Sequence, residues 1–254
     1  MKHIYFFAIV AFLLLVIGPF SKAYTQIGLT INVNFNKDGS AHVTERYSLL
    51  LDNDTETETF QNYVEFGQNT IIEWRQFLKD LNYHLSGTAT PQNIKISASR
   101  LLQIGARSAE IDLDYDLPST LTSQTKLKSR LTQYTFNQSY LNFARSTYGQ
   151  TILPSGTTLI FNAPPGSIID TSGSYPIPAE TTSNSLTWVG PITARWKFDY
   201  TIEESLSDEV ATYFNQLYLN IFNTIPYLLP FALVLLILAF GYSKLVKHRP
   251  KEKN

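Results

Sequence analysis

The alternation of apolar and polar positions is clearest between residues 27 and 51. From 27 to 35, apolar side chains occupy every second position and most positions between them are polar, as in a β-strand with one buried face. Residues 36–40 contain an Asp-Gly pair, which favours a tight turn between antiparallel strands, and residues 41–51 alternate again. The pattern predicts a β-hairpin with one apolar face.

The same criterion predicts further strands at 94–102, 107–117, 157–163, 185–189 and 193–203. In the last of these, the alternation directs Trp196 inward and Asp199 outward. Residues 163–180 contain four prolines and predict an extended loop, whereas residues 134–148 show no clear period.

One segment away from the two ends has a helical period. Between residues 70 and 85, large apolar side chains recur at spacings of three and four, with charged residues between them. Thr70 and Glu73 have the spacing of a capping box, and Gly87 supplies a stop. Trp74 is expected in the core. The expected fold is mainly β (α+β): an antiparallel, sandwich-like domain with this one covering helix.

The longest apolar stretch, residues 225–242, contains no charged residue and is followed by five Lys or Arg residues. About 18 helical residues span about 27 Å, close to the thickness of the hydrocarbon core of a bilayer, and a basic cluster marks the cytoplasmic side. We predict a single transmembrane helix at 225–243 and a basic cytoplasmic tail at 244–254; a buried core helix is the alternative. An amphipathic juxtamembrane helix at 206–224 rests either on the membrane or on the domain.

The N-terminus has the pattern of a secretory signal peptide. Lys2 precedes an apolar segment at 4–18, and Ser21-Lys22-Ala23 fits a cleavage site. The expected organisation is a signal peptide at 1–23 and an exported β-rich domain at 24–205; an uncleaved anchor is the alternative. The protein is thus expected to be a single-pass type I protein of the cell membrane.

Composition narrows the functional classes. The net charge is −1 and only 16% of residues are charged, which argues against nucleic-acid binding. The absence of cysteine excludes disulfides and lipid attachment at an N-terminal cysteine. Asn53 and Asn137 begin N-glycosylation sequons. Expected partners are the bilayer and other envelope or membrane proteins or glycans; no cofactor is expected.

A row of carboxylates is the main candidate for chemistry. In the 107–117 strand they alternate with apolar residues and comprise Glu110, Asp112, Asp114 and Asp116. Carboxylates two apart on a strand lie about 7 Å from each other, which suits a cation site, with Asp112 and Asp114 as candidate ligands, or the catalytic pair of a surface hydrolase. An ordinary solvated face is the alternative.

A nearby basic segment suggests a partner for this row. Lys126, Lys128 and Arg130 alternate with apolar residues. We therefore predict an antiparallel hairpin of 107–117 with 126–136, with Asp116 opposite Lys126 and Asp112 opposite Arg130. Such pairs would neutralise the carboxylates and leave little reason for a metal.

Glu45 is the exception on the apolar face of the 41–51 strand. It is either a buried functional acid or, as an unpaired buried charge is costly, a residue at the sheet rim or paired with a basic group; the second interpretation is favoured. A cleft that joins Glu45 or Asp114 to His84 would favour an enzyme.

The oxygen-rich run at 52–58 resembles a calcium loop, but it lacks the central Gly and the twelfth-position Glu. It is predicted to be a solvated loop.

No established catalytic motif is present: the chain has no His-Glu-x-x-His, Gly-x-Ser-x-Gly or phosphate-binding loop. A Ser-His-Asp set assembled from distant positions stays possible on sequence grounds. The expected function is a non-enzymatic surface module for interaction, adhesion or envelope assembly, and the alternative is a surface hydrolase that uses the Glu110–Asp116 carboxylates.

Three short motifs resemble an uncharacterised family of membrane-anchored exported proteins of archaeal type, which also occurs in bacteria. The motifs are the 36–40 turn with Val43-Thr44-Glu45, Leu153-Pro154-Ser155-Gly156, and Trp188-Val189-Gly190-Pro191. The resemblance implies a signal peptide, a β-rich ectodomain, a C-terminal span and a short basic tail. It carries over no catalytic residue.

Overall fold

The computed structural model describes residues 24–67, 70–87, 89–101, 107–205, 210–211, 213–220, 236 and 238. The predicted signal peptide at 1–23, the tail at 244–254 and nearly all of the predicted span at 225–243 lie outside these residues. Within the described part of the chain, no helix is both long and apolar enough to cross a bilayer. Residues 210–211 and 213–220 are helical, as predicted. The chain divides into two compact units, Met1–Leu127 with Leu131–Ile202, and Lys128–Arg130 with Glu203–Asn254.

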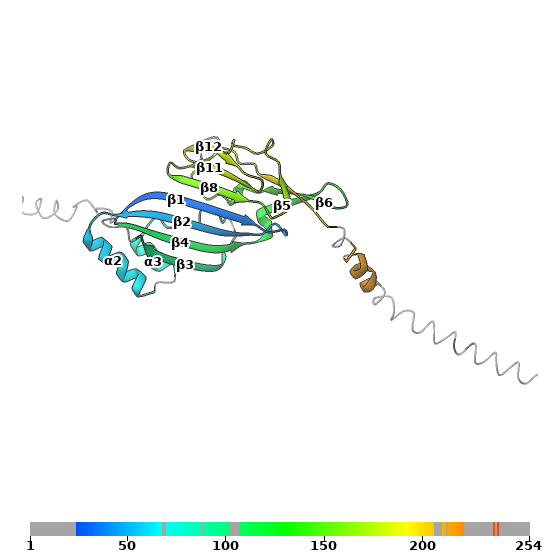
Figure 1. Cartoon of the computed structure of the whole chain (residues 1–254), viewed down its shortest axis with the longest axis horizontal. Coiled ribbons are helices and arrows are strands. Elements are labelled where there is room, and N and C mark those ends of the chain that lie inside the picture. The colour runs from blue at the N-terminus through cyan, green and yellow to red at the C-terminus, as the bar shows by residue number, and fades with distance from the viewer. Residues whose placement is uncertain are drawn as a thin grey trace, which may run out of the picture. The chain divides into compact units, whose positions relative to one another are not determined.

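The first unit is built on a seven-stranded sheet with the order β10-β11-β8-β1-β2-β4-β3 (Figure 1). Its strands are β1 (Tyr24–Phe35), β2 (Ala41–Leu51), β3 (Gln92–Arg100), β4 (Ser108–Leu117), β8 (Thr157–Asn162), β10 (Glu180–Thr181) and β11 (Ser185–Val189). β1 and β2 form the predicted hairpin, with Phe35 opposite Ala41. β1 and β8 run parallel, so the sheet is mixed rather than antiparallel throughout. The apolar alternation marks a buried face and does not encode strand direction.

Two smaller sheets complete the β-structure. A four-stranded sheet contains β5 (Thr122–Lys126), β6 (Leu131–Phe136), β13 (Asp199–Glu203) and β9 (Ser167–Ile169), and a two-stranded sheet contains β12 (Ile192–Ala194) and β7 (Thr151–Leu153). The ring of Phe35 on β1 lies 6.2 Å from that of Phe136 on β6 and 5.6 Å from that of Tyr200 on β13. These contacts pack the four-stranded sheet against the large one, as a sandwich requires.

Two helices, α2 (Asp54–Glu65) and α3 (Ile71–Phe77), lie beside β3 and β4 in Figure 1. Phe60 of α2 packs on Trp74 and Phe77 of α3, with ring centroids 5.6 and 5.5 Å apart. Phe77 in turn stacks on Tyr24 of β1 at 5.7 Å. Trp74 is 1% exposed, which confirms its predicted place in the core.

The helix predictions need two corrections. The capping box of Thr70 and Glu73 is present, but α3 ends at Phe77 rather than at residue 85. The later leucines of the helical pattern are nevertheless fully buried, because the non-helical segment that carries them also packs in the core. The 52–58 run is not a solvated loop: Asn53 accepts a hydrogen bond from Glu56 N at 3.0 Å and begins α2. Its acidic residues favour the helix N-terminus.

The predicted pairing of 107–117 with 126–136 is wrong. β4 lies between β2 and β3, and β5 pairs with β6 in the smaller sheet, where Lys126 faces Thr132. Charge alternation determines a register only between two strands that are neighbours in a sheet. It does not indicate which strands are neighbours. The predicted 193–203 strand is divided into β12 and β13, and Asp199 is buried at 2% exposure rather than outward.

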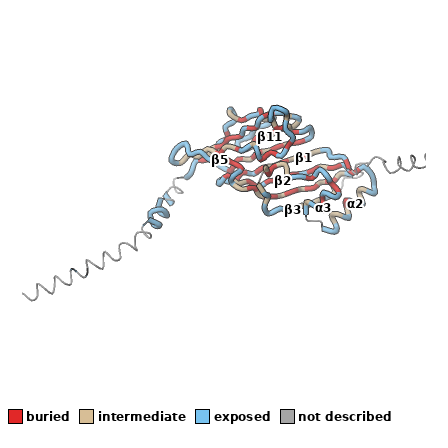
Figure 2. The backbone as a smooth tube through the Cα atoms, turned by 180° about the vertical axis from the view of Figure 1, so that it is seen from behind, coloured by how far each residue is buried: buried red, intermediate tan, exposed pale blue. Residues whose placement is uncertain are grey.

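Burial alternates along β1, β2 and β4, as the sequence pattern predicts (Figure 2). Beyond the irregularity at its start, β1 buries every second side chain, and β4 alternates between buried and half-buried positions throughout. The helices and the four-stranded sheet cover the apolar face of the large sheet. The opposite face, which carries the carboxylate row, is polar.

Candidate functional site

Glu45 lies at the centre of a polar cluster on the covered face of the large sheet. The alternation of β2 places it between Val43 and Tyr47, and all three side chains are fully buried. A carboxylate in such a place is stable only when hydrogen-bond donors replace its water. Glu45 is therefore not at the sheet rim; it is a buried acid, and its partners include a histidine.

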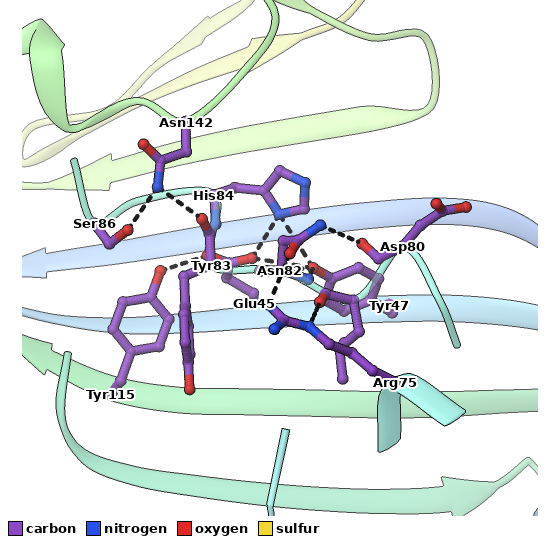
Figure 3. Close-up of polar contacts among 11 residues, drawn as sticks. Glu45, Tyr47, Arg75, Asp80, Asn82, Tyr83, His84, Ser86, Tyr115 and Asn142 are labelled. Carbon is purple, nitrogen blue, oxygen red and sulfur yellow. Dashed lines mark hydrogen bonds and ion pairs between the residues drawn. The ribbon is translucent and has the colours of Figure 1, made fainter. Parts of the chain in front are cut away.

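Both carboxylate oxygens of Glu45 have donors (Figure 3). Oε1 accepts from the backbone N–H of His84 at 2.6 Å and from the hydroxyl of Tyr115. Oε2 lies 2.8 Å from His84 Nδ1, and the hydroxyl of Tyr47 is 3.5 Å away. The first three contacts are short hydrogen bonds, and they leave the acid well satisfied.

Tyr47 joins the cluster to the backbone of the segment that follows α3. Its hydroxyl donates to Asn82 O at 2.6 Å, accepts from Asn82 N at 3.2 Å and lies 3.1 Å from His84 Nδ1. Burial, with the negative charge of Glu45 as the second cause, raises the pKa of both Tyr47 and Tyr115 above the ordinary value for tyrosine. Both phenols stay neutral and act as donors.

His84 presents the arrangement of an imidazole oriented by a carboxylate. Nδ1 faces Glu45, so a hydrogen on Nδ1 leaves Nε2 as the nitrogen with the free lone pair. In Figure 3 the second ring nitrogen points away from Glu45. The ring stacks on Phe143 at 5.0 Å, and the side chain is 18% exposed. An imidazole held in this way can accept a proton.

The segment that carries His84 is also hydrogen-bonded to residues 140–142. His84 O accepts from Asn142 N at 2.9 Å, and Tyr140 O accepts from the N–H groups of Ser86 and Gly87 at 3.0 and 3.1 Å. At Gly87, φ is +55° and a Cβ would lie 2.9 Å from Tyr140 Cα, so both the backbone angle and the close approach require glycine. Glu45 thus holds the segment to which residues 140–142 are bonded.

The carboxylate row lies on the opposite, polar face of the sheet, with its partners on β2. Asp112 accepts from Arg46 Nε at 2.8 Å and from its NH2 group at 3.1 Å. Asp114 accepts from the hydroxyl of Thr44 at 2.7 Å. No group of three or more His, Asp or Glu side chains suited to a metal occurs among the described residues. The sequence thus anticipated that cross-strand partners take up these acids, but not which strand supplies them.

Asp116 is bonded from both neighbouring strands. It accepts from Asn93 Nδ2 at 2.7 Å, and His42 Nδ1 lies 2.8 Å away. These two hydrogen bonds, that of Asn93 first, lower the pKa of Asp116 below the ordinary value. Asn93 has a positive φ of 52° at an irregularity of β3, and this conformation turns the local backbone away from a regular ladder.

Both sequon asparagines are exposed and their side-chain oxygens are engaged. Asn53 caps α2, as described above. Asn137 precedes a short 3-10 helix, η2 (Gln138–Tyr140), and its Oδ1 accepts from Ser139 N at 3.1 Å and Ser139 Oγ at 2.7 Å. In both cases the nitrogen that would carry a sugar has no hydrogen-bond partner among the described residues.

A groove of about 500 Å³ opens near Asn137. Its lining is mostly neutral and polar, with two aromatic residues, and consists of Thr120, Thr122, Ser123, Thr135, Phe136, Asn137, Gln138, Trp196 and Lys197. None of these residues belongs to the Glu45 cluster. Residues 134–148, which supply part of the lining, show no clear period, so the groove could not be predicted from the sequence. The two tyrosine partners of Glu45 could have been predicted from the alternation. Tyr47 lies on the same face of β2 as Glu45, and Tyr115 lies on the buried face of the neighbouring strand β4.

The comparisons with known proteins place the chain in no family. No family model and no curated protein matches it. Among solved structures, it is similar to the NMR structure of the folded domain of LppM from Mycobacterium tuberculosis. That similarity has a TM-score of 0.34 and 7% identity, and covers 76% of this chain and 98% of that one. A similarity at this level carries no argument about function.

Proposed function

We propose that this chain is an exported, membrane-anchored protein whose β-rich domain is a non-enzymatic binding module at the cell surface. The two apolar ends of the sequence support the location, with the basic residues after 243 on the cytoplasmic side. The archaeal-type family that the motifs resemble has the same plan. The partners proposed are envelope or membrane proteins or glycans.

The proposed binding role rests on a contrast in hydrogen bonding between the carboxylates of β4 and the polar groups that line the groove. Asp112, Asp114 and Asp116 are each hydrogen-bonded to a side chain of a neighbouring strand. The groove instead keeps polar groups, such as Asn137 Nδ2, that make no hydrogen bond within the part of the chain that the structure describes. A surface that holds unpaired donors is suited to bind a polar ligand.

Affinity capture of the full-length protein from its native membranes tests this proposal. We expect an envelope or membrane component to be retained by the wild-type chain and to be lost when a groove residue, Gln138, is changed to glutamate. Gln150→Glu, the same change outside the groove, is the matched control. Equal retention by the Gln138→Glu variant, or retention of nothing, would contradict the binding role of the groove.

A surface hydrolase is the second candidate, and one contact favours it: the 2.8 Å distance between Glu45 Oε2 and His84 Nδ1. In that case His84, rather than the Glu110–Asp116 row, would be the base. Hydrolysis of chromogenic esters and glycosides by the purified protein tests it. Turnover that falls in a His84→Gln variant of unchanged thermal stability would establish the hydrolase; absence of turnover favours the binding module.

A further inference from the structure

Two side-chain amides on the groove are oriented so that their NH2 groups remain available. Gln138 Oε1 accepts from Trp196 N at 3.0 Å, and Asn137 Oδ1 accepts from Ser139. Because both carbonyl oxygens are used by the protein, both amide nitrogens are left as donors. Each amide is held by its own hydrogen bond, so little ordering is needed when a ligand binds.

The rest of the lining is short of charge. Among the residues that line the groove, only Lys197 carries a formal charge. Its Nζ lies 3.3 Å from Oδ2 of Asp199, whose side chain is 3% exposed. An anion such as phosphate would have to compete with this buried carboxylate for the same cation. The hydroxyl of Thr135 adds a further polar group without a protein partner in the described structure. Trp196 also lines the groove: it is only 5% exposed, and its indole N–H is buried without a hydrogen-bond partner among the described residues.

We propose that this groove binds a neutral, polyhydroxylated ligand of the glycan class. Sugar hydroxyl and ring oxygens accept hydrogen bonds from amide and indole N–H donors. The inference rests on the proposed function, since it names the ligand of the binding module.

The test uses the full-length protein in detergent micelles, produced in a host without N-glycosylation and labelled with ¹⁵N. Maltotriose, mannotriose and chitotriose are titrated separately, with inorganic phosphate as the contrasting probe. We expect at least one trisaccharide to shift the side-chain amide signals of Asn137 and Gln138 and the indole signal of Trp196. Phosphate is expected to leave all three unchanged. Shifts with phosphate, or with none of the trisaccharides, would overturn the proposal.

Isosteric variants separate ligand binding from structure. Gln138→Glu and Asn137→Asp keep the oxygen that accepts from Trp196 or Ser139, but they replace the NH2 donor with an acceptor oxygen and add one negative charge. We expect each to weaken trisaccharide binding about tenfold, the effect of losing about 1.4 kcal/mol. Gln150→Glu, a matched change outside the groove, should bind as the wild type. Equal affinities for all four proteins would refute the assignment of these donors.

A sugar attached at Asn137 would offer the same chemistry from within the chain. Protein from a glycosylating host distinguishes the two sources: if it no longer binds the free trisaccharide, the chain's own sugar fills the groove, and if it binds equally well, the ligand is external. Failure of every sugar to bind the unglycosylated protein removes the glycan inference alone. The binding module itself fails only if capture from membranes also fails.

Discussion

A single carboxylate, that of Glu45, is bonded to three neighbouring residues inside the core. Its neighbours on the same face of β2 are apolar, yet it is fully buried, because His84 and Tyr115 supply the donors that water would otherwise provide. Removal of one member of such a buried network leaves the others unpaired, and that cost exceeds the value of any one hydrogen bond.

Glu45→Ala should therefore lower the free energy of unfolding by about 3–5 kcal/mol. Asp112→Ala is the matched control, since it removes a carboxylate from an ion pair with the half-exposed Arg46 and should cost about 1 kcal/mol or less. Chemical denaturation of both variants measures the difference. A cost for Glu45→Ala as small as that for Asp112→Ala would mean that the buried cluster is not what holds this part of the domain together.

The lowered pKa of Asp116 leads to a second prediction for a single residue. Its pKa is lowered first by Asn93 and then by His42, so the carboxylate favours the folded state above the ordinary pKa of aspartate, about 3.9. That contribution is lost as the pH falls through the lower, folded-state pKa. Asn93→Gly removes the amide but tolerates the positive φ, and should raise the pKa of Asp116.

An NMR titration of the side-chain carboxyl carbons measures this shift. Asp38 and Asp170 are internal controls, because the largest causes of their lowered pKa values, hydrogen bonds from Ser40 and Ser172, lie within their own turns. The account is contradicted if all three values move together, or if Asp116 does not respond to Asn93→Gly.

Among the elements, α3 offers the sharpest test of packing. Trp74 is 1% exposed and Ile72, two residues away, is 70% exposed. Trp74→Ala should cost about 3–5 kcal/mol, whereas Ile72→Ala should change stability by no more than about 0.5 kcal/mol. Thermal or chemical unfolding distinguishes them. A Trp74→Ala cost below about 1 kcal/mol would show that the indole is not core, and would make it a candidate binding surface instead.

The elements also show what the sequence encodes. Strand positions in β1, β2, β4 and β11 follow from alternation alone, because alternation records which side chains are buried. The same logic misplaced the end of α3: Leu81 and Leu85 have helical spacing and are buried, but the backbone between them is not helical. Apolar spacing identifies buried residues more securely than it identifies the backbone that carries them.

Long-range pairing was the part that could not be predicted. The β4 carboxylates have basic or polar partners, as expected, but these lie on β2 and β3 rather than at 126–130. Two sets of residues satisfied the same charge rule, and nothing local distinguishes them. The groove combines Thr120, Thr135, Gln138 and Lys197 from distant parts of the chain, so no contiguous motif could mark it.

At the scale of the whole molecule, the buried phenols predict the alkaline behaviour. The pKa values of Tyr47, Tyr115 and Tyr200 are raised by burial. An unfolded chain releases these protons near pH 10, so stability is fully present below about pH 10 and is lost as the pH rises toward the folded-state values. Tyrosinate absorbance and circular dichroism should then change together above about pH 10. Ionisation of all 15 tyrosines in a protein that stays folded would contradict the raised values.

The central proposal is that a C-terminal anchor holds the β-rich domain outside the cell. The direct measurement is protease treatment of intact cells that express the full-length chain with a C-terminal tag. We predict that external protease removes the domain around residues 24–205 and leaves a short tagged fragment in the membrane, because the proposed orientation puts the tag with the basic tail in the cytoplasm. Loss of the tag from intact cells, or protection of the whole chain, would contradict the account.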